Sequence, residues 1–241
     1  QRKADNIVSI MSGDEIRALP NANAAEAAAR IPGVSTERDE GEGKFLQIRG
    51  TEPRLSNVTV DGVHIPATEQ GDRIAKLDDV PTDLLGAIEV TKTLTADMEA
   101  DAIGGSVNLS TKIPEGAPRG YFSGQLGQST LLDHRQGQGS MTYGGRFGGE
   151  KKLGLLFSGS YDRNNRVIND VELGWTVDNG RSIPVEFDDR DYTYYRERYG
   201  AGGQLDYRFE DGGTAYVRGL FSLFKNWGTR YRYDLGVDGV Q

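Results

Sequence analysis

The residues best suited to chemistry in this sequence are a run of carboxylates late in the chain, Glu186, Asp188, Asp189 and Asp191. Carboxylate oxygens are the ligands that hard cations such as Ca²⁺ and Mg²⁺ prefer. A dense run of like charges is also typical of a solvated segment. The second interpretation is favoured, and we assign no metal site.

Other catalytic combinations are poorly represented. The sequence has no cysteine, and its two histidines, His64 and His134, are far apart. It therefore offers no thiol chemistry, no Cys-ligated zinc and no evident catalytic triad. Residues 41–45, Gly-Glu-Gly-Lys-Phe, lack the spacing and the Ser/Thr of a P-loop. We expect a protein that is not an enzyme and that needs no cofactor.

Composition divides the 241 residues into two parts at residue 114. All 11 Tyr, both Trp and 7 of the 8 Phe follow that residue, so Phe45 is the only aromatic residue before it. Residues 1–114 carry 12 basic and 19 acidic side chains, whereas residues 115–241 carry 16 and 17. Segments that differ this much are unlikely to share one core, and we expect domains at 1–114 and 115–241.

Charge and hydropathy exclude some classes of protein. The net charge is −8, and no basic stripe is present that could displace counterions from phosphates, which argues against a nucleic-acid partner. No apolar run reaches the ~18 residues of a transmembrane helix. Residues 1–30 lack the charged start and apolar core of a signal peptide, so if the protein is exported, we expect its leader to have been removed already.

Capping signals predict two short helices in the first part. Ser12 and Glu15 have the spacing of a capping box, which predicts a helix that runs to Pro20. Asn23 precedes an alanine-rich segment that ends at residues 32–33, Pro-Gly, and this pattern predicts the second helix.

Strands and turns account for the rest of the first part, which we expect to be a small α+β unit. The sequence predicts strands at 45–49, 58–60, 63–65, 87–91 and 106–111, with a helical turn at 81–85. The Asp61-Gly62 pair is the two-residue turn of a hairpin. The polar, glycine-bearing segments 38–44 and 66–72 are expected to be loops.

Alternation with period 2 dominates the second part. In 199–209 the odd positions are mostly apolar or aromatic, whereas the even positions include Gln204, Asp206 and Arg208. This pattern is typical of a strand with one apolar and one wet face. Including 153–161 and the weaker segments 120–128, 137–147 and 213–227, we expect five strands of about 9 to 14 residues.

A soluble sandwich and a membrane barrel both explain this alternation. The connections favour the barrel, because 148–151 and 210–213 are tight turns whereas 164–190 reads as a long polar loop. Five strands cannot close a barrel, and lipid does not tolerate an open sheet edge. We therefore expect these residues to be an N-terminal portion of a longer polypeptide.

Five motifs in order resemble a known family. They are ALPNANAAEAAARIPGV (18–34), FLQIRG (45–50), VTVDGV (58–63), AIEVTKT (87–93) and DAIGGSVNLSTK (101–112), followed by barrel-type strands. Together they are similar to the plug domain and first barrel strands of TonB-dependent outer-membrane receptors. The longer forms of these motifs most resemble the branch common in Caulobacter-like and related Gram-negative bacteria.

The resemblance implies a fold and an activity. The fold would be an α+β plug domain followed by antiparallel strands of a transmembrane β-barrel, of which about 22 strands would be present when complete. The Gly-Gly pair at 104–105 would let the last plug strand turn and approach its neighbours closely before the chain enters the barrel. The activity would be active import of a scarce nutrient across the outer membrane of a Gram-negative bacterium.

The resemblance also implies partners. They would be TonB with its inner-membrane ExbB–ExbD complex, a small-molecule or oligosaccharide substrate and outer-membrane lipid. TonB pulls on a short segment called the TonB box in this family. Residues 1–16 contain no convincing version of it, so we expect it upstream.

Particular residues take roles from the resemblance. A plug arginine pairs with barrel glutamates in the family, and Arg49 of the Ile-Arg-Gly motif is the residue that can take this role. Lys92 stands where the commoner family form has Arg-Gly-Pro and could substitute, though without the bidentate fork of arginine. Substrate-binding positions map to Glu52, Arg54, His64, Glu69, Gln70 and Asp72, and each of these also suits an ordinary solvated loop.

Two other functions remain open from the sequence. One is a passive or structural outer-membrane barrel protein without energy coupling. The other is a soluble carbohydrate-binding module. For an importer, an oligosaccharide and a ferric siderophore-type complex are both suitable substrates, and the acidic plug slightly favours the oligosaccharide.

Overall fold

The computed structural model describes residues 7–19, 21, 23–67, 74–96, 98–99, 102–130 and 134–236. The chain forms two compact units. The first unit comprises residues 1–124, 139–161 and 198–223, and the second comprises 125–138, 162–197 and 224–241. The boundary that composition suggests at residue 114 stays a prediction.

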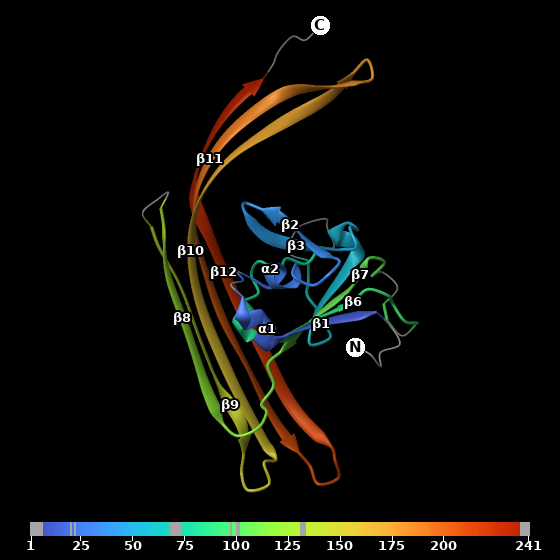
Figure 1. Ribbon diagram of the computed structural model, residues 1–241, viewed down its shortest axis with the longest axis vertical. Coiled ribbons are helices and arrows are strands. Elements are labelled where there is room, and N and C mark those ends of the chain that lie inside the picture. Colours follow the sequence, from blue (N-terminus) through green and yellow to red (C-terminus); the bar gives the residue numbers. More distant parts are fainter. Residues whose placement is uncertain are drawn as a thin grey trace. The chain divides into compact units, whose positions relative to one another are not determined.

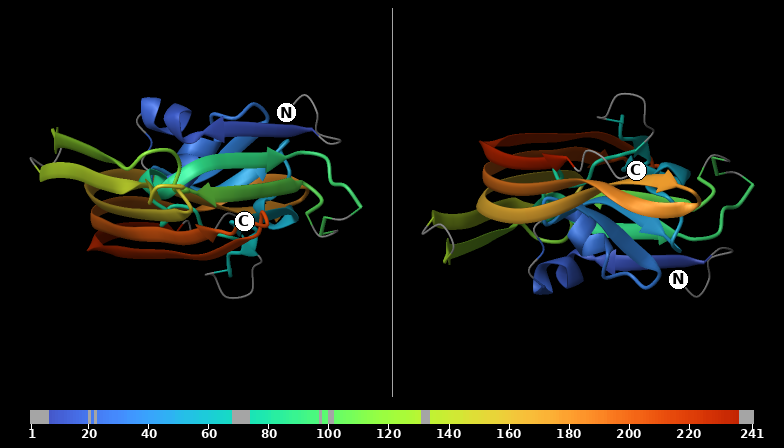
Figure 2. Two further views of the ribbon diagram at one scale, coloured as in Figure 1. Left: turned by 90° about the horizontal axis from the view of Figure 1, so that it is seen from below. Right: turned by 90° about the horizontal axis from the view of Figure 1, so that it is seen from above.

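The N-terminal region of the first unit, which contains the elements from β1 to β7, is built on a five-stranded mixed sheet. Its order is β1-β6-β7-β4-β5 (Figure 1), with bounds β1 Val8–Ser12, β4 Ser56–Val60, β5 Val63–His64, β6 Leu85–Thr91 and β7 Gly105–Thr111. Strands β4 and β7 run parallel, whereas β6 is antiparallel to both β1 and β7. Figure 2 shows β1 at one edge of this sheet.

Two short helices and a separate hairpin complete this region. The hairpin consists of β2 (Val34–Asp39) and β3 (Glu42–Ile48), and the helices are α1 (Gly13–Ala18) and α2 (Ala24–Ala28). Single 3₁₀ turns lie at η1 (Pro53–Leu55) and η2 (Thr82–Leu84).

The helix caps confirm the sequence prediction. Ser12 and Glu15 form a complete capping box, in which the Ser12 backbone N–H donates to Glu15 Oε2 at 2.7 Å. The Asn23 side chain accepts from the backbone N–H of Glu26 at 3.0 Å. Each cap satisfies N–H groups that a helix leaves unpaired at its start. This explains why elements of only six and five residues begin where they do.

The core of the N-terminal region is made of small and branched aliphatic side chains. The alanines of α2 at positions 24, 25, 27 and 28 are fully buried, and Ile48, Ile88, Val90, Val107 and Leu109 are buried with them. Alanine lets the helix approach β3 closely, since it adds little bulk. A short helix and three strands thus share one aliphatic cluster, and Phe45, 8% exposed, is buried outside it.

Gly104 and Gly105 allow the backbone to pack closely against its neighbours at the start of β7. Gly105 has φ +144°, and a Cβ there would lie 2.7 Å from the carbonyl oxygen of Thr91 and 3.0 Å from Ile48 Cδ1. A side chain on Gly104 would meet the hydroxyls of Thr51 and Ser56. This confirms that the pair allows close backbone approach.

Five long strands follow, and each pairs with the next in the order β12-β11-β10-β9-β8. Their bounds are β8 Arg119–Ser129, β9 His134–Phe147, β10 Leu153–Asp178, β11 Arg181–Arg208 and β12 Thr214–Gly236. The number of strands and the tight turns near 148–151 and 210–213 agree with the sequence prediction.

The long strands are polar on the covered side and apolar on the exposed side. On β11, Gln204 and Asp206 are 9% and 2% exposed, whereas Leu205 and Tyr207 are 49% and 43% exposed. Neighbouring strands repeat this, with Ser158 buried next to exposed Phe157. Such an arrangement is the reverse of a soluble sandwich and is typical of a barrel whose outer face contacts lipid.

Two predicted loops are wrong. Residues 164–190 were expected to form a long loop, but β10 continues to Asp178 and β11 begins at Arg181, with a tight turn at Asn179 and Gly180. Residues 38–44 form the tip of the β2–β3 hairpin, where Glu40 and Gly41 have positive φ. The polar side chains of these segments suggested loops. Paired strands can carry polar side chains where ion pairs or solvent satisfy their charges and hydrogen bonds.

Among the described residues, helices are all too short and polar to span a bilayer.

The glycine pair yields a stability prediction. We expect Gly105→Ala to destabilise the N-terminal region by about 1–3 kcal/mol, because the new Cβ meets backbone in a conformation that L-residues rarely adopt. Amide hydrogen exchange of β7 measures this. Gly149→Ala is the matched control, since a Cβ at Gly149 meets nothing within 4 Å. Equal protection in the two variants would contradict the packing argument.

Candidate functional site

Two of the predicted substrate-binding residues line one small cavity. It has a volume of about 160 Å³, and its lining includes Arg54, Asn57, His64 and Ile65. Arg54 comes from η1 and His64 from β5, so the fold brings together two motifs that are separate in sequence. We call this the small cavity.

The small cavity has a polar rim whose side chains are hydrogen-bonded to carboxylates. His64 Nε2 lies 2.6 Å from Glu99 Oε1, and Arg54 Nε donates to Glu52 Oε2 at 2.5 Å. The Asn57 amide reaches Glu99 at 3.5 Å. Glu52 thus joins the site through Arg54. Asn57 and Glu99 also belong to this site, although no sequence motif pointed to them. The remaining predicted positions, Glu69, Gln70 and Asp72, lie outside the described residues.

Arg49 and Lys92 make contacts within the N-terminal region. Arg49 has φ +54° and donates through Nη2 to the carbonyl oxygen of Gly104 at 3.2 Å. Lys92 Nζ donates to Ser9 Oγ at 2.9 Å. The pairing of Arg49 with barrel glutamates stays a prediction.

A buried ion pair joins the N-terminal region to β11. Arg198 donates through Nη2 to Glu42 Oε2 of β3, and both side chains are almost fully buried, at 1% and 2% exposed. Arg198 Nε also donates to the carbonyl oxygen of Asp78 at 2.6 Å. Here the carboxylate belongs to the N-terminal region and the guanidinium to a long strand.

The segment 76–84 packs against the same strands. Ser222 of β12 donates to the carbonyl oxygen of Asp79. Burial raises the pKa of Asp78, and burial followed by the neighbouring Asp78 carboxylate raises the pKa of Asp79. A Cβ on Gly200 of β11 would lie 2.9 Å from Leu84 Cδ1. A glycine on the strand therefore makes room for η2.

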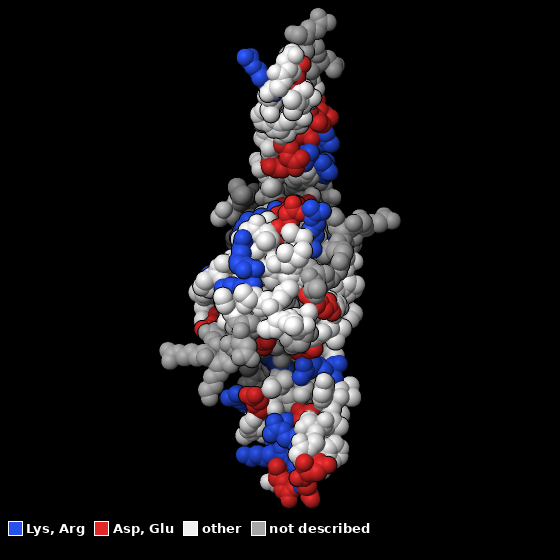
Figure 3. All heavy atoms as spheres, turned by 90° about the vertical axis from the view of Figure 1, so that its right-hand side faces the viewer, with Lys and Arg blue, Asp and Glu red and all other residues white. Residues whose placement is uncertain are grey.

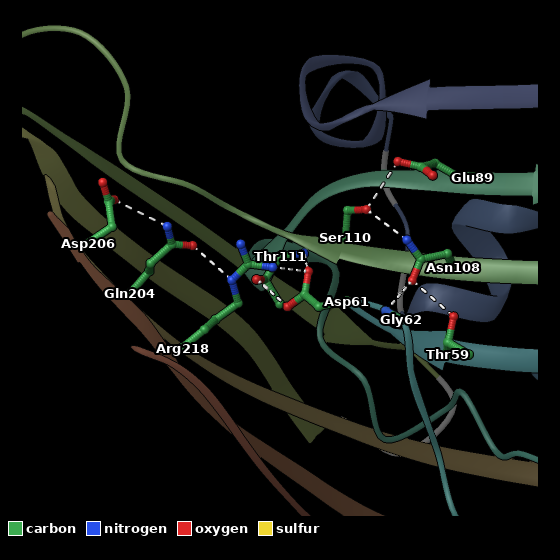
Figure 4. Close-up of polar contacts among 10 residues, drawn as sticks. All are labelled: Thr59, Asp61, Gly62, Glu89, Asn108, Ser110, Thr111, Gln204, Asp206 and Arg218. Carbon is green, nitrogen blue, oxygen red and sulfur yellow. Dashed lines mark hydrogen bonds and ion pairs between the residues drawn. The ribbon is translucent and has the colours of Figure 1, made fainter. Parts of the chain in front are cut away.

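A second ion pair links the Asp61-Gly62 turn to β12 (Figure 4). Arg218 Nη1 lies 2.7 Å from Asp61 Oδ1, and Arg218 Nε donates to Gln204 Oε1 at 2.8 Å. Gln204 in turn donates to Asp206 at 3.2 Å. Arg146 donates to the other oxygen of Asp206 at 2.5 Å. These five residues form a continuous polar chain from the turn to β9.

On its other side the same turn is tied to β7. Asp61 accepts from the backbone N–H of Thr111 at 2.9 Å and from its hydroxyl at 2.7 Å. The backbone N–H of Gly62 donates to Asn108 Oδ1 at 3.0 Å. Asp61 and Gly62 have φ +50° and +81°, as the predicted hairpin turn requires.

A larger cavity, open to solvent, lies between the N-terminal region and the long strands of the first unit. Its volume is about 880 Å³, and we call it the open cavity. Lys112 lines it and donates to the carbonyl oxygen of Asp83 and to Thr142 Oγ1, the latter at 3.0 Å. Burial, followed by the nearby Arg17 cation, lowers the pKa of Lys112 to about 8.

The carboxylate run in the second unit is organised around arginines. Glu186, Asp188 and Asp234 come together, and the Arg232 guanidinium lies within 2.8 to 3.2 Å of all three. Arg190 donates to Asp188 at 2.7 Å. The Arg232 guanidinium already pairs with these carboxylates, so the cluster gives no support for a metal site. Over the residues drawn in colour, Figure 3 shows acidic and basic side chains mixed on one face.

The sequence patterns did not identify the residues that join the N-terminal region to the long strands. Glu42 lay in a segment read as a loop, and Asp61 was noted only for its turn. Arg198 and Arg218 occupy the covered side of alternating strands, which pointed to a wet interior. The alternation could not show which carboxylates they would meet.

The N-terminal region is similar to a known domain family. Residues 1–106 match the family described as TonB-dependent Receptor Plug Domain. No curated protein sequence matches the chain.

Solved structures match most of this chain. One is the ferric citrate transporter FecA in the unliganded form, with TM-score 0.55 and 17% identity over 94% of this chain and 41% of that chain. A mutant of the ferric enterobactin receptor PfeA from Pseudomonas aeruginosa, in complex with enterobactin, matches with TM-score 0.53 and 19% identity over 84% and 34%. The siderophore receptor PirA from Pseudomonas aeruginosa matches with TM-score 0.50 and 22% identity over 93% and 43%.

At these identities the structural matches show the fold alone. An α+β domain is followed by antiparallel strands, as in the matched structures, and the chain spans less than half the length of those structures.

The buried ion pair gives a test of what holds the plug. We expect Glu42→Gln to weaken the packing of β3 by roughly 3–5 kcal/mol, because the buried Arg198 guanidinium loses the carboxylate it pairs with. Hydrogen exchange of the amides of residues 42–48 measures the loss. Asp39→Asn is the control: Asp39 pairs with Lys44 while half exposed, and such surface pairs contribute about 0–1 kcal/mol. Similar losses in both variants would contradict the assignment.

Lys112 gives a prediction on pH. Its pKa of about 8 lies below the value of about 10.4 in an unfolded chain. Between those values the unfolded state binds more protons than the folded state, so this group makes stability rise with pH. We expect hydrogen-exchange protection of wild type relative to Lys112→Met to increase from pH 8 to pH 10. A constant difference would show that Lys112 does not titrate in this range.

Proposed function

Because the chain carries the plug and barrel strands of a TonB-dependent receptor, we propose that it takes part in active import of a scarce nutrient across the outer membrane of a Gram-negative bacterium. The partners would be TonB with the ExbB–ExbD complex, the outer-membrane lipid and a small-molecule substrate. The plug would gate the passage of that substrate.

The observation that carries this proposal is the way the plug is fastened. A fully buried ion pair and a second, partly buried one join it to β11 and β12. Breaking one buried pair costs roughly 3–5 kcal/mol, so thermal motion displaces such a plug rarely. Work supplied from outside, as by an energised partner that pulls on the plug, would overcome this barrier. A passive pore has no use for a plug held in this way.

The small cavity is the proposed point of first contact with substrate. Arg54 and His64 line it, and Glu52 lies next to Arg54, so it offers both hydrogen-bond donors and acceptors. Its volume of about 160 Å³ is below the usual range of complete ligand sites, so it would hold one part of a larger ligand. Glu69, Gln70 and Asp72 remain proposed substrate residues of the adjoining segment.

Two substrate classes suit this chemistry. The matched structures are named as receptors or transporters of ferric enterobactin, siderophores and ferric citrate, which supports a ferric siderophore-type complex. Hydroxyl groups of an oligosaccharide would pair equally well with Arg54, His64 and Glu52. The proposed function includes both classes.

Energy coupling is the decisive test. Cells that produce the complete receptor should accumulate a labelled substrate, chosen by a binding screen of oligosaccharides and ferric chelates. We expect accumulation to stop when a protonophore collapses the proton gradient or when TonB is deleted. Uptake that continues unchanged under both conditions would identify a passive outer-membrane protein.

The small cavity can be tested with the same ligand. We expect His64→Ala to weaken binding roughly three- to tenfold, the range expected for one lost hydrogen bond. Isothermal titration with the purified receptor measures this. Glu37→Ala is the control, because Glu37 is exposed on β2 and does not line the small cavity. Unchanged binding by both variants would remove the small cavity from the substrate site.

A further inference from the structure

On the exposed side of the long strands, apolar side chains give way to charged ones at one level. The side that exposes Phe157 and Tyr207 is mainly apolar along 153–161 of β10 and along 199–209 of β11. Each run is about as long as the 9–11 residues that a strand needs to cross the hydrocarbon layer of a membrane. Two positions beyond these runs, the same side carries Arg163 on β10 and Glu197 on β11. The apolar part of both strands therefore ends at a charged residue.

Contacts between strands align this level from β9 to β12. Asn165 of β10 donates through Nδ2 to the carbonyl oxygen of Arg135 on β9 at 3.4 Å. The Tyr195 hydroxyl of β11 lies 3.5 Å from His134 Nε2 of β9. The Tyr195 ring also stacks on Trp227 of β12, with ring centroids 6.1 Å apart. These residues therefore form one row across the four strands.

Three exposed cations gather at this row. Arg135 belongs to it, and Arg163 and Lys225 each lie two residues from a member of the row on their own strand. Residues two apart share one face of a strand, so all three cations lie on the same side of the sheet. Glu197 is placed in the same way on β11 and is half-buried. We call Arg135, Arg163, Glu197 and Lys225 the cationic cluster.

The cationic cluster is a local exception in an acidic chain. It has three cations to one carboxylate, whereas the whole chain has a net charge of −8. Further along the same side of β11, towards the turn at Asn179 and Gly180, the exposed residues Asp191 and Asp189 are acidic. An anion on this side of the strands is therefore attracted to the level of the aromatic rings and repelled beyond it.

This combination of side chains suits the headgroup of a lipid. Tyrosine and tryptophan gather where the apolar layer of a membrane meets its headgroups. An arginine binds a phosphate through two parallel hydrogen bonds, and a lysine adds a point charge. The tight turns at 148–151 and 210–213 lie at the other end of the strands, and short turns mark the periplasmic end of an outer-membrane barrel. The cationic cluster would accordingly face the outer leaflet.

We propose that the cationic cluster binds the phosphate-bearing headgroup of a lipid in the outer leaflet. The inference rests on the proposed function, because it requires the chain to lie in the outer membrane, and it concerns a lipid partner and not the imported substrate. Phosphate oxygens accept hydrogen bonds from Arg135, Arg163 and Lys225. The acyl chains lie against the apolar side of the strands.

Native mass spectrometry of the complete receptor, purified in detergent, tests this with defined lipids. The probes are lipid A with two phosphates and its monophosphoryl form, added in equal amounts. We expect wild type to retain the diphosphoryl form in preference. Arg163→Gln and Lys225→Gln should each lower its retention about fivefold, the factor expected for one basic side chain beside an anionic headgroup. Glu197→Gln removes the only carboxylate of the cluster and should raise retention.

The matched control is Arg181→Gln, which removes an exposed arginine at the start of β11, next to the turn at Asn179 and Gly180. It should retain lipid like wild type. Heat-modifiable mobility in gels checks the folding of each variant. The gain expected for Glu197→Gln cannot result from misfolding, so it supports the proposal independently of the losses.

The other outcomes would count against the proposal. A folded double variant, Arg163→Gln with Lys225→Gln, that retains lipid like wild type would overturn the site. Equal retention of the two probes would overturn the role of phosphate, and displacement of the lipid by excess inorganic phosphate would identify a site for the free ion instead. A loss in Arg181→Gln as large as in Arg163→Gln would show attraction without a site. Because no TonB, proton gradient or substrate is present, these results do not depend on the energy-coupling experiment, which tests the proposed function by itself.

Discussion

The structure depends on a carboxylate of the plug that is buried against an arginine of the barrel strands. A charge removed from water is tolerated only with a counter-charge and further hydrogen bonds. Glu42 and Arg198 meet this condition together, and the Asp78 carbonyl supplies an additional acceptor. The segment that carries Asp78 and Asp79 is drawn into the same contact, and η2 packs on a glycine of β11. The pair therefore fixes one point of contact between the plug and β11.

The N-terminal region and the long strands bury opposite kinds of side chain. The plug buries mainly alanine, valine, isoleucine and leucine, and the small alanine side chains let α2 lie close to β3. The long strands bury polar side chains and expose apolar ones, as Asp206 and Tyr207 illustrate. Polar groups on the covered side are available to pair with the plug. An interface between the two is therefore made of ion pairs and hydrogen bonds.

One hairpin contributes to both the small cavity and the open cavity. Asp61 lies at its turn, next to the open cavity, whereas His64 on β5 lines the small cavity. Strand β5 has only two residues, so little secondary structure separates the two positions. A contact at His64 and the ion pair at Asp61 therefore act on the same short element.

The sequence by itself determined the elements whose causes are local. The caps at Ser12 and Asn23, the Asp61-Gly62 turn and the alternation of the strands follow from spacing of a few residues, so they could be predicted. Tertiary structure alone decided that Glu42 meets Arg198 and that Asp61 meets Arg218, because no local rule selects a partner more than 150 residues away. Tertiary structure also decided that β10 and β11 continue through the polar segment 164–190, which composition had suggested to be a loop. Pairing between neighbouring strands satisfies the backbone N–H and C=O groups of that segment.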